Sequence, residues 1–305
     1  MSTLDAKIGM VGYGEVGKIL ARALRDRGLA WVGAWDILFR DAVQGMPMKT
    51  HARDAGIEPC ASAVALLERA DIVISAVTAA NSLEVAKEAA GSIRPETYFL
   101  DLNSASPATK AASANLIEAA GAHYVEAGVM TSVPPYGIRV PMVIGGKRAA
   151  ELAAKLSPLG FSMEVVATEI GVASAIKMCR SIIVKAMEAM VIESYTTARR
   201  YGVEQRVLES LKETFPGLDW EKQGAYFFSR VARHGQRRAE EMREAAVTVR
   251  EAGFEPWIAS ATAEKHQWVA ALAHAGLFRG VNEADWRDYA DRLLSAPAPV
   301  EVRSA

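Results

Sequence analysis

The sequence is poor in cysteine, net charge and long apolar runs, and each shortage excludes a class of protein. Only Cys60 and Cys179 occur among 305 residues, which argues against a disulfide framework and favours a reducing compartment. Lysine and arginine total 35 against 36 aspartate and glutamate residues, a balance that attracts neither nucleic acid nor an anionic membrane. Charge interrupts every apolar run before the roughly 20 residues that span a bilayer, and the start lacks the pattern of a signal peptide. We therefore expect a cytoplasmic protein with no membrane or nucleic-acid partner.

Metal-binding spacing is also lacking. The five histidines form no pair four residues apart, and no cluster of cysteine and histidine has ligand spacing. We expect no metal site. The length fits two domains on the usual prior of about 100 to 200 residues each.

The N-terminal stretch has a strand, a glycine turn and a helix in succession. Lys7 to Val11 is a short apolar run, and Lys18 to Arg27 has helical spacing. The turn between them consists of Gly12, Tyr13, Gly14, Glu15, Val16 and Gly17. A second apolar run ends at Asp36, 19 residues after Gly17. This context is typical of a dinucleotide fingerprint, with glycines for the turn, the pyrophosphate and the helix packing, and the acid for the ribose.

The choice of dinucleotide rests on the same acid. A carboxylate at Asp36 repels a 2′-phosphate and so favours NAD, whereas Arg40 could accommodate NADP if its loop folds back. The alternative is a glycine turn that serves packing only, with Asp36 as an ordinary surface residue. We predict NAD as the cofactor, with NADP possible.

Strands and helices continue to alternate up to the strand predicted at Phe161 to Val166, and this alternation predicts a parallel sheet covered on both faces. Ligands bind such sheets at the carboxyl ends of the strands. Three predicted loops there carry polar or distinctive side chains, namely Val77 and Thr78, then Asn103 and Ser104, then Met130, Thr131 and Ser132. Each loop, taken alone, could equally be a solvated connection.

Thr168 to Tyr201 predicts one long helix, because it has no proline and no glycine between Gly171 and Gly202. Its middle is apolar on most faces, which indicates a helix enclosed by other protein. Ser174, Lys177, Arg180 and Ser181 share one face near its start. A shielded lysine there would suit acid–base catalysis. The alternative is a lysine that reaches solvent from a buried helix.

Only helices are predicted after Gly202, including Asp219 to Glu251 with a break near Gly235. Arg230, Arg233, His234 and Arg237 form a basic stripe on one helical face, which indicates a solvated face with ion pairs or, less simply, an anion contact. Phe227 and Phe228 are predicted to be core residues. Ser106 with Pro107 predicts a helix start without chemistry.

Taken together, these motifs resemble the beta-hydroxyacid dehydrogenases, the family of 3-hydroxyisobutyrate and 6-phosphogluconate dehydrogenases, in the form with a shorter helical C-terminal domain. The resemblance rests on the fingerprint, Asp36, the Asp-Leu-Asn-Ser segment, a loop after a strand ending Glu-Ala, and a Gly-x-x-x-x-x-Lys helix at Gly171 and Lys177. It implies an α/β fold with a Rossmann-type domain over 1–167, a long interdomain helix, and an all-α substrate and dimerisation domain over 168–294. Residues 295–305 are predicted to be a mobile tail.

The resemblance also implies roles for residues. Lys177 would be the catalytic acid–base group, while the cofactor would be bound by the glycine turn, Asp36, Val77, Thr78, Asn103 and Ser104. Ser104, Met130, Thr131, Ser132, Arg180 and Ser181 would bind substrate. Met130 stands where the family has serine and Ser181 where it has asparagine, so the carboxylate-binding shell is altered.

The sequence thus predicts a homodimeric NAD(P)-dependent dehydrogenase that transfers hydride between the nicotinamide and a small hydroxy acid or related alcohol. One alternative is an imine reductase, against which Lys177 counts. The other is a cofactor-binding protein without turnover.

Overall fold

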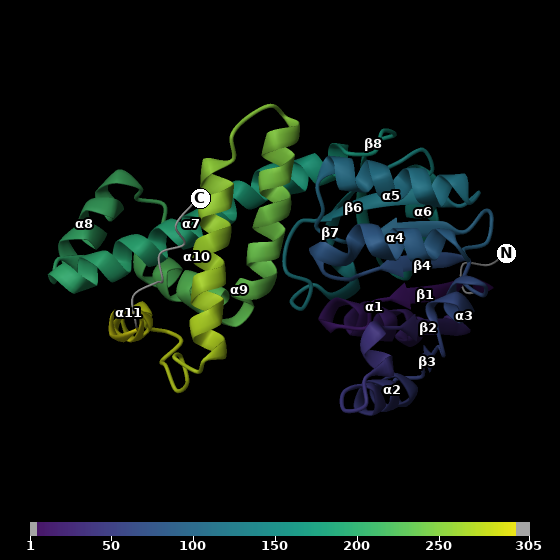
Figure 1. Cartoon of the computed structure of the whole chain (residues 1–305), viewed down its shortest axis with the longest axis horizontal. Coiled ribbons are helices and arrows are strands. Elements are labelled where there is room, and N and C mark those ends of the chain that lie inside the picture. Colours follow the sequence, from purple (N-terminus) through teal and green to yellow (C-terminus); the bar gives the residue numbers. More distant parts are fainter. Residues whose placement is uncertain (1–4, 297–305) are drawn as a thin grey trace, which may run out of the picture. The chain divides into compact units, whose positions relative to one another are not determined.

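The computed structural model describes residues 5–296 (Figure 1). The chain forms two compact units, one up to Cys179 and one from Arg180. No helix within residues 5–296 combines the length and the apolar character that a membrane span requires. The predicted tail lies outside the described residues apart from Ser295 and Ala296.

An eight-stranded sheet forms the centre of the first unit, in the order β3-β2-β1-β4-β5-β6-β7-β8. The strands are β1 (Lys7–Val11), β2 (Trp31–Trp35), β3 (Glu58–Pro59), β4 (Ile72–Ser75), β5 (Tyr98–Asp101), β6 (His123–Val129), β7 (Pro141–Gly145) and β8 (Ser162–Ala167). The strand order reverses between β1 and β4, which is where doubly wound sheets bind ligands at their carboxyl ends.

The first six strands run parallel, as the alternation predicts. The expectation of a parallel sheet is wrong for the last two strands. Strand β7 runs antiparallel to β6, and β8 runs parallel to β7. Residues 130–140, between β6 and β7, contain only the short 3₁₀ turn η4 (Gly137–Arg139). A parallel neighbour would need a longer crossover.

Helices cover both faces of this sheet. They are α1 (Glu15–Asp26), α2 (Gly45–Asp54), α3 (Ala63–Leu67), α4 (Ser82–Ala90), α5 (Pro107–Ala119) and α6 (Ala149–Leu156). One core joins alternate strand residues to α1, α2 and α6, and the other joins the remaining strand residues to α3, α4 and α5. Figure 1 shows α4 and α5 side by side over their face. The two cores follow from the period of two along each strand.

The sequence pattern missed α2 and β3. Helix α2 has a weak apolar face, with only Gly45 and Ala52 buried, and β3 is two residues long. Neither carries the periodicity that makes an element visible in sequence.

Helix α7 (Val172–Tyr201) is the predicted long helix, and its 30 residues correspond to roughly 45 Å. It begins four residues later than the predicted start at Thr168. Gly171 has φ of +108°, a conformation that glycine tolerates and that no α-helix contains. The glycine therefore ends the preceding turn and sets the first helical residue.

The described part of the second unit is helical: besides the part of α7 from Arg180 onward, it contains α8 (Glu204–Thr214), α9 (Trp220–Glu251), α10 (Trp257–His274) and α11 (Trp286–Ser295). This confirms the predicted fold class. Phe227 and Phe228 are core residues as predicted, and Phe228 packs against Trp286 and Tyr289.

The predicted break near Gly235 is wrong, because α9 is continuous through it. A Cβ at Gly235 would lie 2.8 Å from the His266 carbonyl oxygen and 3.0 Å from the Ala270 Cβ. The glycine is there because α10 approaches α9 closely at this point.

Candidate active site

The glycine turn lies between β1 and α1 at the carboxyl edge of the sheet. Gly12 has φ of +95°, and a Cβ on it would lie 2.4 Å from the Ala76 carbonyl oxygen. A Cβ on Gly17 would lie 2.1 Å from the Gly12 carbonyl oxygen. Both positions therefore exclude a side chain by contact with backbone.

Gly14 differs, because nothing lies within 4 Å of a Cβ built there. It is the N-cap of α1 and supplies no side-chain cap, so the first-turn amides stay available to an anion. Glu15 and Val16 continue the turn into α1. Open space above an uncapped helix N-terminus fits a dinucleotide pyrophosphate.

Asp36 follows β2 beside this turn. Its Oδ2 accepts a hydrogen bond from the Tyr13 amide at 2.7 Å, and its Oδ1 accepts one from the Leu38 amide at 2.9 Å. Each oxygen retains a lone pair. The carboxylate is thus fixed against the glycine turn, where the ribose of a bound dinucleotide would meet it.

Tyr13 contributes only its main chain to this edge. Its ring is fully buried and packs on Phe39, and its hydroxyl lies 3.1 Å from His51 Nδ1. Burial raises the pKa of Tyr13 to about 12. The side chain of this predicted cofactor residue is a core element.

Asn103 joins the ends of β4 and β5. Its Oδ1 accepts a hydrogen bond from the Val77 amide at 2.7 Å, and its Nδ2 donates to Ser75 Oγ at 2.9 Å. It is 3% exposed. Asn103 therefore positions Val77, whereas Thr78 and Ser104 lie nearer the surface, and Thr78 Oγ1 accepts from Asn81.

Asp101, at the end of β5, is fully buried in a network that sequence reasoning missed. Lys110 on α5, also fully buried, pairs with Asp101 Oδ1 at 3.0 Å, and the Tyr124 hydroxyl donates to Oδ2 at 2.6 Å. Burial and the Asp101 charge hold the pKa of Tyr124 well above its usual range. Asp101 Oδ1 also accepts the Asn103 amide. The available signal was Lys110 on the same helix face as Ser113, Ala114 and Ile117.

Lys177 lies against the next strand of the same edge. A Cβ built on Gly128 of β6 would be 3.2 Å from the Lys177 Cβ and 2.9 Å from the Ala173 carbonyl oxygen. Lys177 is half-buried. The candidate residues thus lie at neighbouring strands, in the sheet order β2, β1, β4, β5 and β6. Asp36, the glycine turn, Val77 and Asn103 follow the first four strands, and Gly128, which contacts Lys177, lies near the end of β6.

Met130, Thr131 and Ser132 begin the loop after β6. The Met130 amide donates to the Pro141 carbonyl oxygen at 2.9 Å, which fixes the start of this loop, and Thr131 is exposed. These residues directly follow the strand that contacts Lys177.

Arg180 and Ser181 lie further along α7, in the second unit. Arg180 is exposed. Ser181 is 6% exposed and accepts a hydrogen bond from Lys185 Nζ at 3.1 Å. Lys185, which the sequence did not single out, therefore occupies an acceptor lone pair of the Ser181 hydroxyl.

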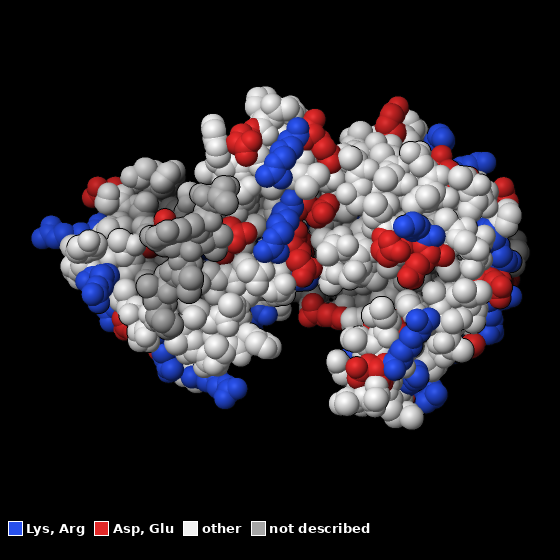
Figure 2. All heavy atoms as spheres, viewed as in Figure 1, with Lys and Arg blue, Asp and Glu red and all other residues white. Residues whose placement is uncertain are grey.

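The basic stripe on α9 is largely paired within its own unit. Arg233 bonds Glu283, and Arg237 lies 3.3 Å from Glu241. Arg230 lies 5.9 Å from the centre of the Tyr226 ring. Figure 2 shows basic and acidic side chains interspersed on the face in view. These contacts favour the ion-paired face over the anion contact.

The turn, the switch point and the fixed acid define the class: a Rossmann-type dinucleotide-binding protein. A family model described as the NAD binding domain of 6-phosphogluconate dehydrogenase matches residues 7–159, and a domain of unknown function matches residues 198–269. The chain belongs to the beta-hydroxyacid dehydrogenase family and is an NAD(P)-dependent oxidoreductase.

Three solved structures show how far the likeness extends. A conserved hypothetical protein from Sinorhizobium meliloti 1021 is 37% identical, with 95% of this chain and 96% of that chain covered and a TM-score of 0.74. A conserved protein of unknown function, reported as structurally similar to 3-hydroxyacid dehydrogenases, is 31% identical, with coverage of 88% and 98% and a TM-score of 0.66. The 3-hydroxyisobutyrate dehydrogenase of Mycobacterium tuberculosis, solved with L-serine, is 18% identical over 96% and 100%, with a TM-score of 0.66. At that identity the last shows the fold alone.

Proposed function

We propose that the protein oxidises or reduces a small hydroxy acid or related alcohol at its CH–OH carbon, with Lys177 as the general acid and base. When bound, the nicotinamide supplies the hydride chemistry. The observation that carries the proposal is the position of Lys177 beside Gly128, at the same sheet edge as the glycine turn and Asp36. In the oxidative direction the lysine accepts the hydroxyl proton, and in the reductive direction it returns that proton.

The cofactor would be held by main-chain amides at Gly14 and the first turn of α1, and by the Asp36 carboxylate. NAD is favoured because Asp36 is held at the turn by two backbone amides and would repel a 2′-phosphate. Arg40 lies 5.4 Å from the centre of the Trp35 ring, next to this acid. Titration with NADH and NADPH, followed by fluorescence of the six tryptophans, tests the preference. Asp36→Ser should reduce the difference in affinity between NADH and NADPH. Tighter binding of NADPH than of NADH by the unaltered protein would contradict the predicted preference for NAD.

Within the first unit, the substrate shell would include Ser104, Thr131 and Ser132. Met130 adds an apolar side chain where the family has serine, which favours a bulkier or less polar substrate than 3-hydroxyisobutyrate. A panel of hydroxy acids and alcohols, monitored by absorbance of the reduced nicotinamide, tests this choice. Turnover of cyclic imines alone would replace the proposal with an imine reductase, and cofactor binding without turnover would indicate a sensor.

Lys177→Ala tests the acid–base role. Turnover should fall by a factor of about 100 or more, while the dissociation constant for NADH stays within about twofold, because Lys177 is remote in sequence and strand position from the glycine turn. Lys147→Ala is the matched control, since Lys147 is an exposed lysine paired with Glu118. Normal turnover of the Lys177 variant would contradict the mechanism.

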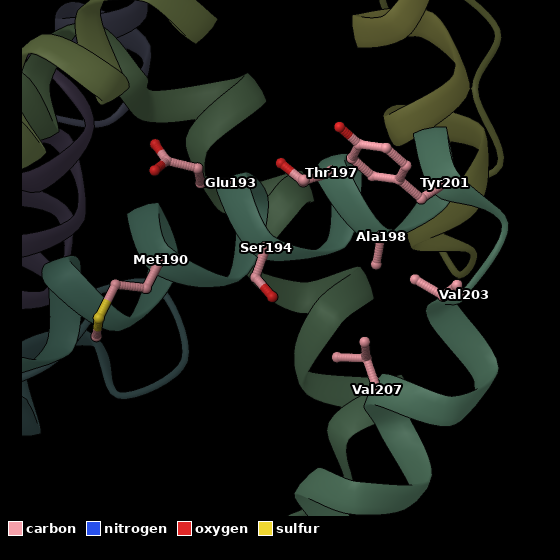
Figure 3. A pocket seen from close by; sticks show the side chains of 8 residues that line it. All are labelled: Met190, Glu193, Ser194, Thr197, Ala198, Tyr201, Val203 and Val207. Atoms are coloured by element: carbon pink, nitrogen blue, oxygen red, sulfur yellow. The ribbon is translucent and has the colours of Figure 1, made fainter.

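We also propose that the protein works as a homodimer through α7. Ile176, Ile183 and Met190 are spaced by seven residues and exposed by 38%, 66% and 58%, a spacing that suits contact with another helix. Figure 3 shows Met190 at one end of an apolar groove that Tyr201, Val203 and Val207 also line. Light scattering after gel filtration should give twice 32.8 kDa, and Ile183→Glu should shift the mass toward the monomer. A monomeric unaltered protein would contradict this assembly.

A further inference from the structure

Glu126 is a fully buried acid in β6, and its carboxylate accepts hydrogen bonds from three backbone amides. Its Oε1 accepts from the amides of Gly171 at 2.7 Å and Ala173 at 3.0 Å, and its Oε2 accepts from the Ser174 amide at 3.3 Å. Those amides belong to the start of α7. A strand residue 45 positions earlier in the chain therefore caps this helix.

The arrangement explains why a carboxylate is tolerated in the core. The first amides of a helix have no partner within the helix, and its N-terminus carries a partial positive charge. Gly171 has no side chain with which to cap its own helix. Bonds from several amides to one carboxylate are charge-assisted, and therefore about twice as strong as neutral ones.

The neighbouring strand makes room for this carboxylate. Gly145 of β7 is the register partner of Glu126, and a Cβ on Gly145 would lie 3.0 Å from Glu126 Oε1. Because Gly145 has no Cβ, the carboxylate has room to lie beside β7 and reach the amides of α7.

The same strand contacts α7 a second time. Gly128 lies two residues after Glu126, so both positions project to the same face of the sheet. The Cβ position of Gly128 is 2.9 Å from the Ala173 carbonyl oxygen and 3.2 Å from the Lys177 Cβ. Glu126 thus holds the helix end by hydrogen bonds, while Gly128 allows the first two turns to lie directly on the strand.

We propose that Glu126 is a positioning residue for catalysis, which acts through Lys177. Lys177 lies three residues, about one turn, beyond Ser174, the last amide that Glu126 binds. The cap sets the depth of this turn against β6, and thereby the distance of the lysine from the sheet edge where the cofactor binds. This inference rests on the proposed role of Lys177.

A cap that only stabilises the fold would change the free energy of unfolding and leave turnover of the folded enzyme intact. A positioning residue changes turnover selectively, because a displacement of about 1 Å at a reacting group can cost about 100-fold in rate. Glu126→Ala should therefore lower kcat about 10- to 100-fold at a temperature where circular dichroism shows it folded. Its dissociation constant for NADH should stay within about twofold.

Two further variants keep the inference testable if Glu126→Ala fails to fold. Glu126→Gln retains the length and one accepting oxygen, so it should recover part of the lost kcat. Gly128→Ala leaves Glu126 intact but forces α7 away from the strand, so it should also lower kcat without changing NADH binding. Glu118→Gln, at a partly exposed acid paired with Lys147, is the matched control and should be normal.

The double variant Glu126→Ala with Lys177→Ala gives the decisive comparison. If Glu126 acts through Lys177, adding Glu126→Ala to the Lys177→Ala variant should lower kcat by less than about threefold. The effects of residues that act as a unit on kcat are not additive. Fully multiplicative losses, or a normal kcat in folded Glu126→Ala, would overturn the inference. Normal turnover in Lys177→Ala alone would instead overturn the proposed function, so the two failures are distinguishable.

Discussion

The two units bury charge in different ways. At the carboxyl edge of the sheet, Asp36 and Glu126 accept hydrogen bonds from backbone amides. Asp101 accepts one as well, beside its pair with Lys110. In the helical unit, five buried side chains on three helices interact mainly with one another, and we refer to them as the ion cluster: Lys185, Glu188, Arg238, Glu241 and His266. Carboxylates of the first kind fix the main chain, whereas charges of the second kind fix one helix against another.

The ion cluster joins α7, α9 and α10. Arg238 binds Glu188 through two nitrogens, one of them at 2.7 Å, and Lys185 lies 2.9 Å from Glu241. Burial lowers the pKa of Lys185 and raises that of Glu188, although the opposite charges act against both shifts. His266 has no hydrogen-bond partner within the described part of the chain.

This difference explains where a ligand site can form. Backbone-bound acids leave adjacent glycines and amides at the sheet edge in fixed positions, ready for a cofactor. In the ion cluster the charged side chains pair with one another, so they do not hold backbone amides in place for a ligand. They specify helix packing, which is a common role of buried polar networks.

Breaking the ion cluster should have the largest effect on stability. Arg238→Met leaves Glu188 buried without its guanidinium, and removal of one partner of a buried pair costs about 3–5 kcal/mol. Urea denaturation should show this loss, and Arg238→Met with Glu188→Leu should recover most of it. A single-variant cost below about 1 kcal/mol would mean that the cluster does not hold the helices.

The corresponding test at the sheet edge is Asn103→Ala. It leaves the partly buried Val77 amide without its acceptor, which costs about 1–3 kcal/mol. Because the Val77 side chain lies 3.0 Å from the Cβ position of Gly12, the same variant should also weaken NADH binding, as measured by fluorescence titration. Asn103→Asp retains an accepting oxygen, so its stability and its affinity for NADH should lie between those of the unaltered protein and of Asn103→Ala. Loss of stability with unchanged NADH binding would separate Asn103 from the cofactor site.

Acid should act on the ion cluster through His266. Burial, with the Arg238 and Lys185 charges, lowers the pKa of His266 to about 3, against a usual value of 6.5. Glu188 lies 3.7 Å from the ring but is already bound by Arg238. Below pH 6.5 the unfolded chain therefore binds a proton that the folded protein does not, so the contribution of His266 is complete above pH 6.5 and declines as the pH falls toward 3.

Between pH 6.5 and pH 5 this decline amounts to about 2 kcal/mol in the free energy of unfolding. Urea denaturation at the two pH values measures this loss in the free energy of unfolding. His266→Gln should remove the part of the loss that His266 causes. An unchanged pH dependence in the variant would exclude His266 as its source.

The smallest effect on stability is expected at Ser106. Like Glu126 it caps a helix, but the helix it caps is the one that directly follows it in the chain. Ser106 Oγ accepts the Thr109 amide at 3.2 Å, as the sequence predicted. Ser106→Ala should cost about 1 kcal/mol and leave turnover unchanged, measured by urea denaturation and initial rates. A loss of turnover comparable with that of Glu126→Ala would remove the distinction between a local cap and a positioning cap.

Features that depend on neighbouring residues were predictable from the sequence. The glycine turn, Asp36, the Ser106 cap and the long helix up to Tyr201 follow from backbone sterics and a repeat of 3.6 residues, and these are visible within a short window. Gly12 shows the reason, since its φ of +95° is a demand that only glycine meets easily.

Tertiary structure alone decided which distant groups meet. Nothing local shows that Glu126 caps a helix 45 residues later, that Tyr13 is buried, or that Gly235 permits helix contact rather than a break. These outcomes depend on which strands and helices become neighbours, and a hydrogen bond or a steric contact then selects the residue. The sequence by itself therefore determined the class of fold, the dinucleotide turn and the candidate lysine. Packing between β6 and α7 determined where that lysine stands.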